Sequence, residues 1–319
     1  MTTNSNLFEN ISKSLNSIPI NLKHFSLSGF LAPFNLFLIK NLIKNNKKVL
    51  YITNDEQAAL KYQKDLKNLL DINAHIFPMA EIDLYCDLDK NYYTYEEQIN
   101  IFLNSPNVVI ASVKSLFEKF NTLEFYKNNS IVLKKDLSVD YSKIAEKLTR
   151  FGYKRTTQVS DIGEFALRGD ILDIYSLSDN PYRIEFFADT IEDIRKFNPQ
   201  TQKSYSHIDE VTILPLYKFI LDDENKKYFI DEINKLNLDE FKTKIKDELI
   251  EKLNETGYFE GIEYYLGYYA QNLNTVLDYF KDYTILYDET SEIFSKYILI
   301  DENFNKSYNE ALLSDLNYH

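Results

Sequence analysis

Two unlike strand patterns follow one another along this chain, and their order constrains the fold more than any other feature. Two continuous apolar segments are each followed by a helical pattern: "KKVLYIT" (47–53) and "NVVIAS" (107–112). Apolar strands that alternate with helices are typical of a parallel sheet with both faces covered. A third unit of this kind, "KDYTILYDETSEIFSKYI" (281–298), lies near the other end, so we predict that the same sheet resumes there.

The middle of the chain has a different pattern. Its strands alternate apolar and polar residues, which is typical of antiparallel strands with one buried face: "GEFALRGDILDIY" (163–175), "YRIEFFADTIEDI" (182–194) and "EVTILP" (210–215). A helical segment, residues 140–153, precedes them. We therefore predict an α/β fold in which one domain is inserted into another. The first domain comprises residues 1–134 and a largely helical second half, 218–319, and an α+β domain is inserted at 135–217.

The charge of the chain restricts its partners. Asp and Glu outnumber Lys and Arg by 49 to 36, which gives a net charge of −13. Affinity for nucleic-acid backbones rests on Lys and Arg, so the balance disfavours a DNA-binding chain and leaves room only for a local basic patch. One cysteine, Cys86, excludes an internal disulfide. The most apolar early segment, residues 30–43, is interrupted by Lys40 and is too short to span a bilayer, so we predict a cytoplasmic chain. We also expect the chain to be monomeric.

The loop where an α/β sheet of this kind would bind phosphate has lost the required residues. A P-loop reads G-x-x-x-x-G-K-[ST], because backbone amides, a lysine and a hydroxyl together hold phosphate and magnesium. Counted from Gly29, the last three positions hold Phe34, Asn35 and Leu36. We therefore predict that this chain holds no ATP, no Mg and no other cofactor.

A second remnant of nucleotide chemistry lies near the C-terminal side. The segment "ILYDET" (285–290) has the form of a Walker B strand, in which Asp288 and Glu289 would be a magnesium ligand and a water-activating carboxylate. Without a phosphate cradle we interpret both as a relic or as a helix cap. We therefore expect no catalytic residue in this chain.

Two further groups of residues carry little chemistry. The histidines and the cysteine have no metal-ligand spacing, so we predict no metal site: His24, His75, His207, His319 and Cys86. The run "NYYTYEE" contains three tyrosines that could stack on bases: Tyr92, Tyr93 and Tyr95. In a chain with 25 Tyr we interpret this run as an aromatic helix start that packs on its neighbours.

All the arginines of this lysine-rich chain lie in one seventh of its length. They are Arg150, Arg155, Arg168, Arg183 and Arg195. A guanidinium binds carboxylates bidentately and stacks on aromatic rings, which lysine cannot do. Strand alternation places Tyr182, Ile184 and Phe186 on an apolar face, predicted to pack on the helix around Ile144 and Leu148. The opposite face of the same strand holds Arg183, Glu185 and Phe187, which is a composition typical of interfaces.

Residues 151–204 resemble a known family. The segments "GEFALRGDILDIY", "YRIEFFADTIEDIR" and "FNPQTQKS" are together similar to the second domain shared by the excision-repair helicase UvrB and the transcription-repair coupling factor. The last segment has the form found in the coupling factor. Weaker similarity to the first domain of that factor lies in "FPMAEIDLY" (77–85) and "YFEGIEYYLGYY" (258–269). The lost P-loop and the lack of room for UvrB's DNA-threading hairpin also favour the coupling factor.

The resemblance implies a function and a site. In the family this domain docks UvrA, the damage-sensing partner that also binds UvrB, and Arg168, Arg183 and Phe187 match the contact positions, with Glu185 as a neighbouring candidate. The expected function is that of a non-catalytic adaptor in transcription-coupled nucleotide excision repair. The alternative is structural: the arginines form internal salt bridges to Asp170, Asp173 or Glu185, and Phe187 fills the core. We interpret the other three arginines as solvated or structural.

The family also implies partners outside these 319 residues. A coupling factor binds RNA polymerase and double-stranded DNA, and its translocase motor uses ATP and Mg, so the sequence is expected to be an N-terminal fragment. Two other functions stay open. One is an ATP-dependent helicase of the UvrB type that verifies DNA damage, and the other is a direct DNA-binding module.

Overall fold

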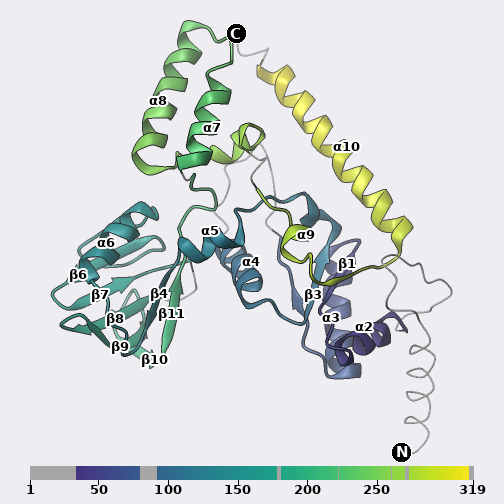
Figure 1. Ribbon diagram of the computed structural model, residues 1–319, viewed down its shortest axis with the longest axis horizontal. Coiled ribbons are helices and arrows are strands. Elements are labelled where there is room, and N and C mark those ends of the chain that lie inside the picture. The colour runs from purple at the N-terminus through teal and green to yellow at the C-terminus, as the bar shows by residue number, and fades with distance from the viewer. Residues whose placement is uncertain are drawn as a thin grey trace, which may run out of the picture. The chain divides into compact units, whose positions relative to one another are not determined.

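The computed structural model describes residues 34–79, 92–177, 181–221, 223–259, 261–269 and 273–315 (Figure 1). These residues belong to two compact units. The first comprises the described parts of 1–79, 100–118 and 275–319, and the second those of 80–99 and 119–274. No helix among the described residues is long and apolar enough to cross a membrane.

The first unit is built on a parallel sheet with the strand order β12-β1-β3-β2. The central strands, β1 (Val49–Thr53) and β3 (Val108–Ser112), are buried at every position. The strands β12 (Thr284–Tyr287) and β2 (His75–Ile76) pair in parallel with β1 and β3 respectively. Burial of both faces explains why the central strands read as continuous apolar runs. The predicted α/β fold is confirmed, including the return of the chain to this sheet.

Helices pack on this sheet through apolar residues. The helices α2 (Phe34–Lys44) and α3 (Glu56–Leu70) bury Leu36, Ile39 and Leu66 in one core with β1 and β3. Asp55 caps α3 by accepting a hydrogen bond from the amide of Ala58, which satisfies a donor that the helix leaves free. The unit ends with α10 (Thr290–Asp315), on which Tyr297 stacks against Phe117 of the 3₁₀ turn η1 (Val113–Phe117).

The second unit contains a six-stranded sheet with the strand order β10-β9-β8-β7-β6-β5 (Figure 1). Its strands are β5 (Lys154–Arg155), β6 (Glu164–Arg168), β7 (Ile171–Ile174), β8 (Tyr182–Phe187), β9 (Thr190–Phe197) and β10 (Ser204–His207). Every neighbouring pair is antiparallel except β5 with β6. Gly169, with φ of +59°, lies in the tight turn that joins β6 to β7.

Further elements complete this unit. A separate antiparallel ladder joins β4 (Ile131–Lys134) to β11 (Glu210–Ile213), and β4 was not predicted. The helix α6 (Tyr141–Arg150) buries Ile144 and Leu148, the two positions expected to face the sheet. The remaining helices are α4 (Tyr92–Asn104, shared between the two units), α5 (Leu123–Asn128), α7 (Asp223–Ile233) and α8 (Glu240–Thr256). Buried Phe229 and Tyr269 belong to a hydrophobic core that includes residues of α7 and α8.

Residues 261–280, which lie in the half predicted to be largely helical, do not form one continuous helix. The segment forms the 3₁₀ helix η2 (Ile262–Tyr268) and then, after residues outside the described ones, the one-turn helix α9 (Val276–Tyr279). The backbone of Asn274 exchanges both hydrogen bonds with Phe120, at 2.9 and 2.7 Å, so this residue pairs as a strand would. This long-range pairing interrupts the helix, and Thr275 then caps α9 with a capping box.

Candidate functional site

One face of the six-stranded sheet carries charged side chains on neighbouring strands. The register sets four residues opposite one another in a single row: Ala166 of β6, Asp173 of β7, Arg183 of β8 and Arg195 of β9. The next row includes Arg168, Glu185 and Asp193. Side chains directly opposite each other across strands share a face, so all these residues lie on the same side of the sheet.

Asp173 lies at the centre of this face and has an exposed side-chain fraction of 0%. Arg183 donates from Nε to Oδ1 at 2.7 Å and from Nη2 to Oδ2 at 2.9 Å, which is a bidentate pair. Arg168 lies on β6, which flanks β7 on the other side, and it donates from Nη2 to Oδ2 of Asp173. A buried carboxylate without partners would be strongly destabilising, so both arginines are needed where they lie.

Arg183 is fixed on its other sides by the segment 197–204. Its Nη1 donates to the carbonyl oxygen of Gln202 at 3.2 Å, and its guanidinium lies over the ring of Phe197 at 4.8 Å. Hydrogen bonding to Asp173 raises the pKa of the Arg183 guanidinium, and the nearby carboxylate charge acts in the same direction. The "FNPQTQKS" segment, which carries part of the family resemblance, therefore supplies two of the contacts that hold this arginine.

A second ion cluster lies beside the first. Arg195 donates from Nη2 to Glu185, and its Nε lies 3.2 Å from Oδ2 of Asp193. The Nδ1 atom of His207 lies 3.0 Å from the other oxygen of Asp193. With neutral His207, this cluster has two carboxylates and one guanidinium, whereas the Asp173 cluster has one carboxylate and two guanidiniums. The face therefore presents adjacent patches of opposite sign.

Phe187 stands at the end of β8 on the same face. Its exposed fraction is 73%, which Phe241 alone equals among the large apolar residues that the structure describes. The next residue, Ala188, has a left-handed φ of +52°, where the chain turns towards β9. A large apolar ring exposed to water on the face that also carries Arg168 and Arg183 has the composition of a binding anchor.

The predicted alternation of β8 is confirmed, because Tyr182, Ile184 and Phe186 are buried. The alternative of a purely structural role is right about the internal salt bridges and wrong about Phe187. Internal salt bridges do form, and they involve Asp173 for both arginines, whereas Glu185 pairs with Arg195. Phe187 does not fill the core. Of the other arginines, Arg195 is ion-paired, and Arg150 and Arg155 are exposed.

The sequence did not point to Phe197 or Gln202 as part of this face, and it pointed to Asp173 only as one of three possible salt-bridge partners. A signal for Asp173 was present, because it interrupts the apolar strand "ILDI" at a position that alternation places on the face of the arginines. A charge in a strand of this kind needs a partner of opposite charge nearby. The contribution of Gln202 came from its backbone carbonyl, which no sequence pattern predicts.

At the position where a P-loop would carry lysine, Asn35 takes part in hydrogen bonds with other side chains of the first unit. Asn35 donates from Nδ2 to the hydroxyl of Tyr51 at 2.6 Å, and Tyr51 donates to Oδ1 of Asp288 at 2.7 Å. Burial, together with the hydrogen bond to Asp288, raises the pKa of the Tyr51 hydroxyl. Leu36 has no exposed surface and belongs to the core. Asp288 is thus bound to two neutral side chains, and Glu289 is exposed directly before α10.

Of the other residues named in the sequence analysis, some lie within the described part of the chain and some lie outside it. Tyr95 is buried against Tyr126, with ring centroids 6.4 Å apart, as the packing interpretation expected. The side chains of Phe34, Tyr92 and Tyr93 are not described. Four further residues that entered the sequence argument lie outside the described residues: Gly29, His24, Cys86 and His319.

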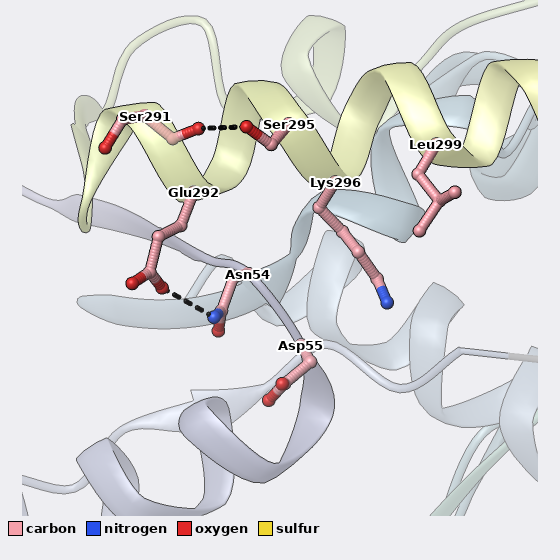
Figure 2. Close-up of a pocket in the computed structure, with 7 residues that line it drawn as sticks. All are labelled: Asn54, Asp55, Ser291, Glu292, Ser295, Lys296 and Leu299. Carbon is pink, nitrogen blue, oxygen red and sulfur yellow. Dashed lines mark hydrogen bonds between the residues drawn. The ribbon is translucent and has the colours of Figure 1, made fainter.

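A shallow polar groove lies in the first unit, at the carboxyl end of β1. Figure 2 shows Asn54 donating to Glu292 of α10, 3.0 Å apart, across one side of this groove. Its volume is about 430 Å³, and its lining residues are Asn54, Asp55, Ser291, Glu292, Ser295, Lys296 and Leu299. The one lysine is balanced by two carboxylates, so the groove has no charge that would select an anion.

Comparison with known protein families identifies the class of the domain that carries the charged face. Residues 131–219 match the family model of the UvrB interaction domain, so the charged face belongs to a domain of that family. The matched range starts at β4 and ends beyond β11, so it includes the whole six-stranded sheet.

The particular relatives are transcription-repair-coupling factors. The chain is 27% identical over 272 residues to the factor of Staphylococcus haemolyticus, which covers 80% of this chain and 23% of that relative. It is 33% identical over 241 residues to the Borreliella burgdorferi factor, covering 72% and 20%. It is 28% identical over 268 residues to the Bacillus subtilis factor, covering 78% and 23%. The predicted resemblance to the transcription-repair coupling factor is confirmed, and the chain spans less than a quarter of the length of these relatives.

Proposed function

We propose that this chain is the part of a transcription-repair coupling factor that recruits UvrA, and that it does so without catalysing a reaction. The observation that carries the proposal is the face formed by Arg168, Arg183, Glu185 and Phe187 within a UvrB interaction domain. We call these four residues the docking face. Its charged clusters are held by internal ion pairs, and its one large apolar side chain is left in water.

An exposed aromatic ring on the same face as oriented guanidinium groups suits a protein partner. Aromatic residues and arginine dominate the binding energy of protein interfaces, because they bury large areas with few rotatable bonds. The adjacent patches of opposite sign suit a partner surface with the complementary order of charges. Nucleic acid fits this face poorly, because Glu185 and Asp193 would repel phosphates beside the arginines.

The proposal of an adaptor without ATPase activity is supported by the first unit. Asn35 stands where a P-loop would carry lysine, so this position supplies no cation for a phosphate, and its side chain donates hydrogen bonds to Tyr51 and Asp288. The alternative of a UvrB-type helicase requires ATP binding at this position. A calorimetric titration with ATP and Mg at millimolar concentration should give no binding heat. Saturable heat would favour the helicase alternative over the adaptor.

The wider role follows from the relatives. A coupling factor would bring UvrA to a stalled RNA polymerase, and the ATP- and Mg-dependent motor that acts on double-stranded DNA would lie outside this chain. We propose a cytoplasmic location and a monomeric state for the chain on the same basis.

Competition with UvrB tests the proposal. If the docking face mimics UvrB, the chain and UvrB should exclude each other from UvrA. In a pull-down on immobilised UvrA, excess UvrB should release the bound chain, and a non-binding UvrB fragment without its interaction domain should not. Simultaneous binding of both proteins to one UvrA site would contradict the mimicry.

A further inference from the structure

The two arginines that bind Asp173 differ in how much of each guanidinium is left for a partner. The side chain of Arg183 has an exposed fraction of 16%, and its Nε, Nη1 and Nη2 atoms all donate hydrogen bonds within the domain. The side chain of Arg168 has an exposed fraction of 44%, and among the described residues it is held through Nη2. Arg168 therefore has most of its donors free, whereas Arg183 has few.

We infer that Asp173 and Arg183 are positioning residues, which fix the guanidinium of Arg168 so that it binds a carboxylate of the partner directly. This inference rests on the proposed function and specifies how the docking face works. Asp173 has no exposed surface and cannot itself contact a partner. It acts through Arg168, and Arg183 keeps Asp173 in place by its bidentate pair.

The arrangement suits an acidic group for two reasons. One carboxylate shared by two guanidiniums leaves one unit of positive charge at this place. A free arginine side chain also has many rotamers, and fixing it before binding removes an entropic cost that would otherwise reduce affinity. Lysine at position 168 would keep the charge but lose the planar fork, so it could not bind Asp173 and a second carboxylate in the same orientation.

A double-mutant cycle separates positioning from general structural support. The full chain is titrated with UvrA as the parent, as Arg168→Ala, as Asp173→Asn and as the double variant. We expect each single variant to lose at least about tenfold in affinity. If Asp173 acts through Arg168, the double variant should bind within about twofold of Arg168→Ala, because nothing remains to be positioned. Losses that multiply would overturn the inference.

Two controls keep the result interpretable. Ile184→Val weakens the same sheet from its buried face without touching the ion cluster, and it should leave the affinity for UvrA unchanged. NMR relaxation of the Arg168 guanidinium should report faster motion in Asp173→Asn than in the parent, in the absence of UvrA. Unchanged motion would overturn the positioning role even if the affinity fell.

The outcomes also separate this inference from the proposed function. If the parent does not bind UvrA, the proposed function fails, and the direct contact fails with it. If the parent binds and Phe187→Ala weakens binding while Arg168→Ala does not, the docking face stands and the positioning inference alone is wrong.

Discussion

The guanidinium of Arg183 forms a bidentate pair with Asp173, with donor–acceptor distances of 2.7 and 2.9 Å to its two carboxylate oxygens. The pair joins neighbouring strands on the face opposite the apolar side of β8. Because Asp173 is fully buried, the pair is as much a part of the domain's interior as of the proposed docking face. Substitutions of Arg183 or Asp173 will therefore change both folding stability and binding. Each test needs a control variant that separates the two effects.

Arg183→Ala should destabilise the second unit. The substitution leaves the buried Asp173 with Arg168 as its remaining guanidinium, and it removes the contacts to Phe197 and Gln202. Breaking a buried ion pair from one side is strongly unfavourable, so we expect a loss of about 2–4 kcal/mol in the free energy of unfolding. Urea unfolding measures this loss. Arg155→Ala, at an exposed position, is the control and should change stability by less than about 0.5 kcal/mol. Equal stability of the two variants would contradict the structural role of Arg183.

Glu164 should make stability depend on pH. Burial alone would raise the pKa of its carboxyl group, but hydrogen bonds from the amides of Ser160 and Asp161 and from the Ser160 hydroxyl outweigh burial and lower this pKa. A carboxyl group whose pKa is lower in the folded state stabilises the protein above its unfolded pKa, about 4.3 for glutamate, and loses that contribution as the pH falls through the folded pKa.

Glu164→Gln tests this dependence. At neutral pH we expect the variant to be less stable than the parent by about 0.5 kcal/mol, a modest value because the carboxyl group is partly solvated. The difference should shrink as the pH is lowered below the usual glutamate pKa. Thermal unfolding of both proteins across this range measures it, and a difference that is constant with pH would show that the carboxylate charge has no part in holding the loop.

Tyr51→Phe should destabilise the first unit. The phenol hydroxyl connects Asn35 to Asp288, and its removal deletes the two shortest hydrogen bonds of this partly buried cluster and leaves the longer Asn35–Asp288 contact of 3.3 Å. We expect a loss of about 1–2 kcal/mol in the free energy of unfolding. Tyr287→Phe is a matched control, since the Tyr287 ring is 47% exposed on the neighbouring strand and should tolerate the change. If both variants are as stable as the parent, the polar cluster at the lost phosphate site contributes nothing to the fold.

The apolar and alternating patterns of the sequence predicted much of the fold. Continuous burial of β1 and β3 and alternation in β8 follow from local sequence, because side-chain periodicity reports which faces are covered. The break after η2 did not follow, because Asn274 pairs with Phe120, which lies 154 positions earlier in the chain. The two-stranded ladder of β4 depends on β11, which is also distant in the chain, and was missed for the same reason.

The members of the proposed docking face come from the sequence, whereas its internal contacts come from the structure. Alternation and the arginine cluster pointed to Arg183, Glu185 and Phe187. Which carboxylate pairs with which arginine depended on the strand order, since β7 lies between the strands of Arg168 and Arg183 and brings Asp173 to both. Sequence reasoning had allowed three carboxylates as partners, and only three-dimensional register selects one of them.

The most direct test of the proposed function uses two phenylalanines. Phe187 and Phe241 are each 73% exposed, so replacing either by alanine removes the same group from water and should leave folding unchanged. Calorimetric titration of UvrA with the parent chain, Phe187→Ala and Phe241→Ala compares them directly. We predict binding by the parent and by Phe241→Ala, and a loss of at least about tenfold for Phe187→Ala, as expected for an aromatic interface anchor. Equal binding by all three proteins, or binding by none, would contradict the assignment of this face to UvrA.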